Sequence, residues 1–211
     1  MVTPAPSGRT VFVSRFNRRL AIGLWVLVAV LLASSLLIDP APVKLLGLVP
    51  AAFGVLVGWS ALWHPNVVVD DDGVEVVNVF STVVVPWAAL VHVDTRFALT
   101  LVTPGRKVAA WAAPAPGRAG TAVARRREQR HGRASTVPVA GQGERRAGDL
   151  LATDSGDAAY LVRERWEELR EADRIPLGVA DTTVVPMRLH WLTIVLLVAT
   201  AVGGWFALAA Q

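Results

Sequence analysis

The pattern of apolar positions divides the chain into long uncharged runs and one stretch of short alternating segments. Three runs of 19 or 20 residues carry no charged side chain: residues 20–38, 45–63 and 191–210. The third run lies within a predicted membrane segment at residues 189–210. As helices rising about 1.5 Å per residue, the three runs nearly match a hydrocarbon core of roughly 30 Å. The pattern therefore predicts three transmembrane helices, the first two joined into a hairpin.

The first run also fits a second interpretation, a cleaved signal peptide. It follows a basic tail, residues 1–19, with four arginines and no acidic residue, and it contains a small-residue sequence at 33–35. Its apolar stretch is longer than signal peptides usually have, which favours an uncleaved span.

Residues 64–114 predict an antiparallel β-meander. The stretch is dense in valine and threonine, and turn-forming residues break it too often for a helix of ordinary length. Asp72-Gly73 predicts a type I′ turn, residues 103–106 predict a type II turn, and residues 86–90 are expected to close a further hairpin. About six short strands result.

The composition changes abruptly after the meander. Residues 115–153 are rich in Gly, Ala and Arg and nearly lack large apolar side chains, so they predict a disordered insertion. In residues 154–175, apolar positions recur at three- and four-residue spacing opposite a charged face, which predicts an amphipathic helix that completes the β-domain. Residues 176–188 are interpreted as a linker with room for one strand.

Composition and charge indicate the setting. The 211 residues are 53% hydrophobic with a mean hydropathy of +0.45, which favours a domain with membrane spans. Only two of the 21 basic residues are lysine, a coding bias typical of a GC-rich bacterial genome. Four basic residues lie in the tail and sixteen in residues 64–188. The positive-inside bias therefore predicts that both lie on the cytoplasmic side of the bacterial plasma membrane, with the C-terminus outside.

The residues that commonly carry chemistry are sparse. The absence of cysteine excludes disulfides, thiolate nucleophiles and cysteine-ligated metals. The four histidines lack metal-ligand spacing in the sequence, and P-loop, G-x-S-x-G and G-x-G-x-x-G motifs are absent. The triplet 70–72, three aspartates, lacks the later ligands of a calcium loop and is interpreted as a solvated turn. We therefore expect no catalysis, no cofactor and no metal site.

A basic run in the insertion is the sharpest candidate for binding. Near an anionic leaflet each basic residue contributes about 1 kcal/mol, so the run is a candidate contact for anionic lipid head groups. A solvated linker is the alternative, and nucleic-acid binding is disfavoured because aromatic residues are not interleaved. The candidate residues are Arg125, Arg126, Arg127, Arg130 and Arg133.

Several short segments carry a resemblance to a known family. They are residues 71–74 (DDGV), 85–87 (VPW), 93–96 (VDTR), the hairpin 99–106 and residues 110–114 (AWAAP). In this order, followed by one helix, they resemble the bacterial membrane-anchored pleckstrin-homology (PH) domain family. The chain is similar in particular to the actinobacterial branch that includes a low-molecular-weight antigen.

The resemblance implies an α+β membrane protein, in which a small antiparallel β-barrel or half-barrel is closed by the amphipathic helix. Trp166 matches the helix tryptophan that the family packs into the barrel, and Trp87 and Trp111 are also expected in the core. Eukaryotic PH domains bind phosphoinositides with basic residues around the first hairpin. Three carboxylates in that loop would instead repel a phosphate.

The expected function is that of a non-enzymatic integral membrane protein. It would display a cytoplasmic PH-like domain as a scaffold or adaptor for an unidentified protein partner or for anionic lipid, and an open sheet edge would suit strand addition by a partner. The alternative is an accessory subunit of a membrane transporter or channel, assembled through the same domain. No charged residue lies within the predicted spans, so partner subunits would have to line a pore.

Overall fold

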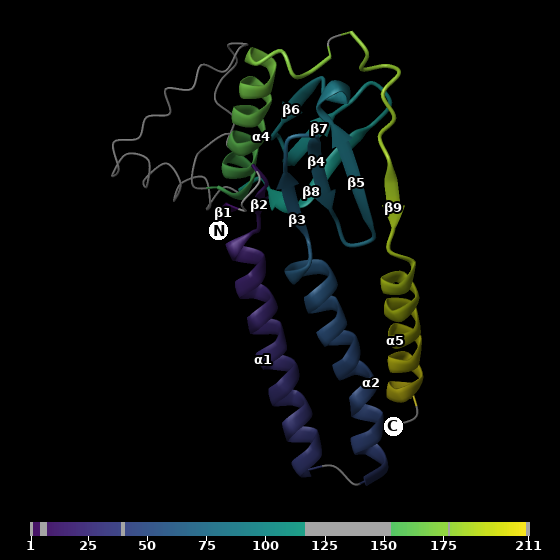
Figure 1. Cartoon of the computed structure of the whole chain (residues 1–211). Coiled ribbons are helices and arrows are strands. Elements are labelled where there is room, and N and C mark those ends of the chain that lie inside the picture. Colours follow the sequence, from purple (N-terminus) through teal and green to yellow (C-terminus); the bar gives the residue numbers. More distant parts are fainter. Residues whose placement is uncertain (1, 5–7, 39–40, 117–152, 177, 210–211) are drawn as a thin grey trace, which may run out of the picture. The chain divides into compact units, whose positions relative to one another are not determined.

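The computed structural model describes residues 2–4, 8–38, 41–116, 153–176 and 178–209, which fall into two compact units (Figure 1). The β-domain comprises Met1–Ser14, Asn66–Val77 and Thr82–Met187, and the helical unit comprises Arg15–Pro65, Asn78–Ser81 and Arg188–Gln211. The predicted meander lies almost wholly in the β-domain, the amphipathic helix lies within it, and the apolar runs lie in the helical unit.

The larger sheet has the strand order β1-β2-β3-β4-β5-β9. Valines at alternate positions of its central strands are buried, because β-branched side chains pack well on a pleated surface. Strands β3 to β5 lie where the valine runs predict them. The strands are β1 (Val2–Pro4), β2 (Thr10–Phe12), β3 (Asn66–Val69), β4 (Gly73–Val77), β5 (Ser81–Pro86) and β9 (Met187–Leu189).

The N-terminal segment, for which the sequence predicts only a basic tail, is part of this sheet. Strand β2 pairs antiparallel with β3, with Phe12 opposite Val67 and Val11 opposite Val68. Phe12 is 3% exposed and belongs to the core. The apolar run of the N-terminal segment, residues 11–13, is too short to predict a strand from the sequence.

A smaller antiparallel sheet is formed by β6 (His92–Asp94), β7 (Ala98–Val102) and β8 (Lys107–Pro114). The hairpin predicted at residues 86–90 is wrong, because β5 and β6 belong to different sheets. The 3-10 turn η2 (Trp87–Ala89) carries the chain from one sheet to the other. Strand β8 lies against β3 and β4, so the inward faces of the two sheets share one core.

Helix α4 (Asp154–Glu171) packs against both sheets. Thr153 caps its start, with the side-chain oxygen accepting a hydrogen bond from the Gly156 amide at 3.1 Å. The helix ends before the predicted residue 175 because Asp173 adopts a φ of 52°, a left-handed conformation that Asp tolerates. The Arg174 amide then donates to the Leu169 carbonyl at 2.9 Å.

Two of the predicted turn types are wrong. Type I′ and type II turns require positive φ at Gly73 and Gly105, and neither is among the described glycines with positive φ. In the first loop the Asp70 carboxylate instead accepts hydrogen bonds from the amides of Asp72 and Gly73, at 3.0 and 2.9 Å. An aspartate side chain thus replaces the backbone conformation that the Asp-Gly pair suggests.

The helical unit contains α1 (Arg15–Ile38), α2 (Ala41–Val57) followed by the π-helix η1 (Gly58–Trp63), and α5 (Trp191–Ala209). By length and composition, Arg15–Ile38 and Leu46–Trp63 are able to cross a membrane, whereas Trp191–Ala207 is a shorter apolar helix. Helix α1 begins five residues before the predicted run. The third span stays a prediction.

Glycines allow α1 and α2 to approach closely. A Cβ atom at Gly54 would lie 2.7 Å from Val28 Cγ2, and one at Gly58 would lie 3.0 Å from Trp25 Cδ1. The Trp25 indole donates to the Val55 carbonyl at 3.2 Å. Gly54 and Gly58 have the Gly-x-x-x-Gly spacing by which small residues bring membrane helices into contact.

Candidate functional site

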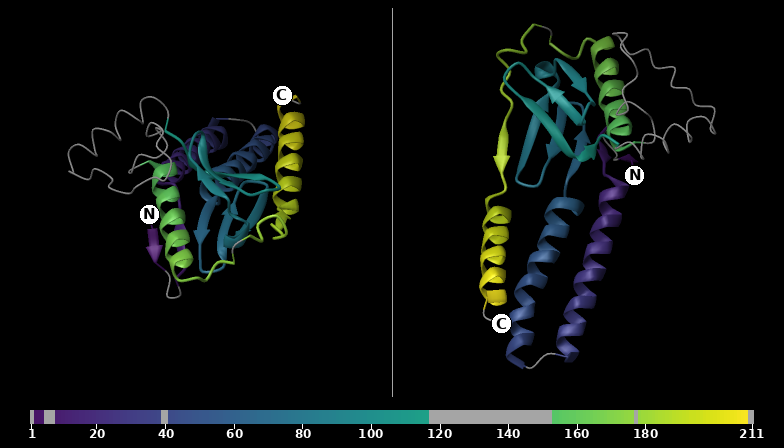
Figure 2. Two further views of the ribbon diagram at one scale, coloured as in Figure 1. Left: turned by 90° about the horizontal axis from the view of Figure 1, so that it is seen from above. Right: turned by 180° about the vertical axis from the view of Figure 1, so that it is seen from behind.

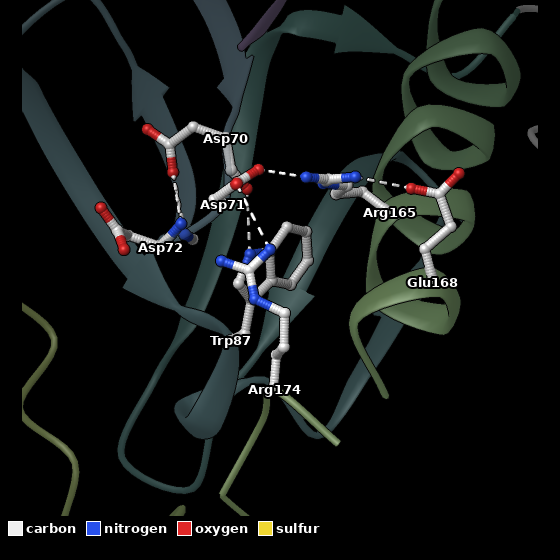
Figure 3. Close-up of polar contacts among 8 residues, drawn as sticks. Asp70, Asp71, Asp72, Trp87, Arg165, Glu168 and Arg174 are labelled. Carbon is white, nitrogen blue, oxygen red and sulfur yellow. Dashed lines mark hydrogen bonds and ion pairs between the residues drawn. The ribbon is translucent and has the colours of Figure 1, made fainter. Parts of the chain in front are cut away.

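The β3–β4 loop, residues 70–72, gathers three carboxylates beside two arginines (Figure 3). Arg165 of α4 pairs with Asp71 Oδ1, and Arg174 pairs with Asp71 Oδ2 at 3.4 Å. Arg165 also pairs with Glu168 at 2.7 Å. Helix α4, the segment after it and the first hairpin of the meander are therefore joined through a single carboxylate.

Trp87 holds the same loop from the core side. Its side chain is buried, and its indole N–H donates to the Asp70 carbonyl at 3.0 Å. A buried indole requires an acceptor, and the loop supplies one. The solvated-turn interpretation therefore suits Asp72, which is exposed, whereas Asp71 is partly exposed and also ion-paired. The prediction that Trp87 belongs to the core is confirmed.

The two arginines set the electrostatics of the loop. The hydrogen bond from Arg165 is the main reason that the pKa of Asp71 lies below its ordinary value of 3.8, and the charges of both arginines act in the same direction. The same hydrogen bond raises the pKa of Arg165. Since Asp71 engages both guanidinium groups, a phosphate would have to displace this carboxylate. The loop is suited to clamp the helix to the hairpin.

A second candidate is the outward face of β6–β8, called here the outer sheet face. The register pairs Thr100 with Ala109 and Val102 with Lys107, and their side chains point away from the core. Trp111 shares this face and is 56% exposed, so the prediction that it belongs to the core is wrong. The reason is the two-residue period of a strand, which turns positions 107, 109 and 111 outward.

Cations and a second aromatic ring border the outer sheet face. Phe97, in the turn between β6 and β7, is 78% exposed, and the Arg96 guanidinium lies 5.1 Å from its ring centroid. Arg106 and Lys107 are exposed at the other end of β7. The Asp94 carboxylate accepts hydrogen bonds from the amides of Thr95 and Arg96, at 2.8 and 3.1 Å. The border therefore carries more positive than negative charge.

Two of the four histidines meet in the helical unit. The ring centroids of His64 and His190 are 5.7 Å apart, Trp59 stacks on His64 at 4.7 Å, and His190 Nδ1 lies 3.3 Å from the Val79 carbonyl oxygen. Burial, together with the neighbouring His190, lowers the pKa of His64 below 6.5. Within the described ranges, no group of three or more His, Cys, Asp or Glu residues is placed to hold a metal ion.

The other predicted residues have different outcomes. Trp166 is partly buried and packs against the core, as the resemblance implies. The five arginines from 125 to 133 lie outside the described residues, so their contact with lipid stays a prediction. Sequence reasoning missed Arg165 as a partner of Asp71, because 94 residues separate the two and no local pattern joins them.

One comparison with known proteins, with protein-family models, agrees with this architecture. Residues 64–147 match the family model of the bacterial PH domain. The match includes strands β3 to β8, and it supports a bacterial PH-domain protein with antiparallel sheets. No curated protein and no solved structure matches the chain.

Proposed function

We propose that the chain is a membrane-anchored bacterial PH-domain protein of the actinobacterial antigen type, which holds its domain at the cytoplasmic face of the plasma membrane as a scaffold for protein or anionic lipid. One observation carries the proposal: three strands of the larger sheet lie one or two residues from apolar helices. The junctions are β2 to α1 (residues 13–14), η1 to β3 (64–65) and β9 to α5 (190).

The surface of α1 supports its assignment as a membrane span. Its apolar side chains at positions 26, 27, 30 and 31 are more than half exposed. An apolar helix that leaves such side chains uncovered is unfavourable in water and favourable in hydrocarbon. A buried core helix of a soluble protein would have covered them.

The proposed role is contact rather than catalysis. Its support is the chemistry of the two candidate sites, an ion-paired clamp and a sheet face with aromatic rings and cations. Neither combines a nucleophile with a neighbouring base, which covalent catalysis would require.

The test uses the full chain in bacterial membranes. After an alkaline carbonate wash, the protein should stay in the membrane pellet and be released by detergent; release by carbonate alone would contradict integral anchoring. Photoreactive residues placed at exposed positions of the β-domain should then form adducts with a protein or a lipid. Absence of adducts from every position argues against a scaffold. Adducts with a transport protein would favour the accessory-subunit alternative.

A further inference from the structure

We propose that the outer sheet face is a contact surface for an anionic lipid bilayer. In this arrangement Trp111 and Phe97 enter the headgroup region, while Arg96, Arg106 and Lys107 approach lipid phosphates. The inference rests on the membrane anchoring of the proposed function, and it identifies which surface of the domain makes the lipid contact.

The aromatic rings protrude from this face because their neighbours are small. Ala98, Thr100 and Ala109 are the outward residues nearest to Trp111 on β7 and β8. Tryptophan and other amphipathic rings are enriched where hydrocarbon meets water, and a protruding ring suits a deformable partner that needs no preformed pocket.

The charge of each surface of the domain determines which surface an anionic bilayer attracts. The outer sheet face has cations at both ends of β7, and its neighbouring acid, Asp94, accepts two backbone hydrogen bonds. Helix α4 instead exposes acidic residues, among them Glu164, Glu167 and Glu171. An anionic leaflet attracts the first surface and repels the second within about a Debye length, roughly 8 Å at physiological salt.

The two aromatic side chains of this face are solvent-exposed, Trp111 by 56% and Phe97 by 78%. In the view from behind in Figure 2, the teal strands β6–β8 stand in the foreground with α4 beside them. Short covalent junctions to the apolar helices would also keep the domain near the bilayer, and such tethering raises the effective concentration of a weak contact.

The experiment places an environment-sensitive fluorophore on the cysteine-free full chain, one copy per lipid nanodisc. The label is attached at Ala109→Cys on the outer sheet face and, as the matched control, at Glu167→Cys on α4. Phosphatidylcholine nanodiscs are compared with nanodiscs that also contain phosphatidylglycerol, at low and high salt. We expect emission at position 109 to shift to the blue and rise at least about two-fold with anionic lipid. At high salt the emission should return to its value in phosphatidylcholine alone. Position 167 should not respond.

Substitutions then test the named side chains. Phe97→Ser with Trp111→Ser should abolish the response at position 109, whereas Tyr160→Ser, which removes an exposed ring from α4, should leave it unchanged. Lys107→Gln should demand more anionic lipid for the same response, and Arg170→Gln on α4 should not.

Each other outcome overturns the inference in a recognisable way. A response at position 167 but not at 109 rejects this surface while leaving lipid contact by the domain in place. No response at either position, in protein that stays in carbonate-washed membranes, rejects lipid contact but not the scaffold role. A response that is equal in neutral and anionic lipid identifies a non-electrostatic contact instead.

Discussion

Single residues from distant parts of the chain meet at the 70–72 loop. Arg165 reaches Asp71 from α4 and Arg174 reaches it from the segment after this helix, while Trp87 reaches Asp70 from η2. Gly8 of the N-terminal segment lies so near that a Cβ atom there would be 2.8 Å from Asp71 Oδ1. The Asp71 carboxylate thus joins α4 and the residues after it to the first hairpin, and the charge of this carboxylate depends on pH.

Asp71→Asn should lower the stability of the β-domain in a pH-dependent way. Because the pKa of folded Asp71 lies below the unfolded value of 3.8, its ionisation stabilises the fold above that pH. This stabilisation is lost as pH falls through the folded pKa. Denaturation of the full chain in detergent, followed by tryptophan fluorescence, should show a difference between wild type and variant that shrinks below about pH 3.8.

The matched control is Asp72→Asn, which changes the exposed neighbour in the same loop. It should lower stability less than Asp71→Asn at neutral pH. A difference between wild type and Asp71→Asn that stays constant from pH 7 to pH 3 would show that the carboxylate charge does not hold the clamp.

Gly73→Ala should destabilise the domain by about 1–3 kcal/mol, because the added methyl meets rigid backbone. Its Cβ would lie 2.9 Å from Pro86 Cα and 3.0 Å from the Val85 carbonyl carbon. Gly105→Ala is the control, since nothing lies within 4 Å of its Cβ position. Urea denaturation should separate the two variants; equal midpoints would contradict the close approach of β4 and β5 at this glycine.

At the scale of elements, local patterns predict the middle strands and α4, because their periods of 2 and 3.6 can be found in one segment of sequence. Strands β1, β2 and β9 are three residues long, and β2 and β9 lie next to strands far along the chain, β3 and β5. In β8, alanines face the core while Trp111 faces outward. Hydrophobicity alone therefore predicts that Trp111 is buried. Only the register of β8 against β7 shows that its side chain faces outward.

Gly58→Leu should separate α1 from η1, which continues α2, because the new side chain would occupy the space of the Trp25 indole. Gly23→Leu on α1 is the control, since its Cβ position has nothing within 4 Å. In detergent, the Gly58 variant should lose its folded peak in size-exclusion chromatography at a lower temperature than the Gly23 variant. If both variants melt together, the close glycine contact does not stabilise this helix pair.

At the scale of the whole molecule, the elements that border the β3–β5 meander are also those that lead to apolar helices. Strands β1 and β2 lie on the β3 side and β9 lies on the β5 side. Strand addition by a partner at β3 or β5 would have to displace them. A partner of the domain would therefore more readily meet a face than one of these two edges.

The positive-inside bias predicts the direction in which the chain crosses the membrane. If the tail and the β-domain are inside and α5 is a third span, the C-terminus is expected outside. The chain has no cysteine, so Gly105→Cys and Gln211→Cys each give a single site for a membrane-impermeant maleimide. In intact cells Gln211→Cys should label at once, and Gly105→Cys only after permeabilisation.

The unsubstituted chain is the control and should not label. If both positions label only after permeabilisation, α5 does not cross and the protein has two spans. If Gly105→Cys labels in intact cells, the β-domain is outside. In that case the cytoplasmic scaffold role fails, and the basic residues of this domain would face the outer leaflet instead of the cytoplasmic one.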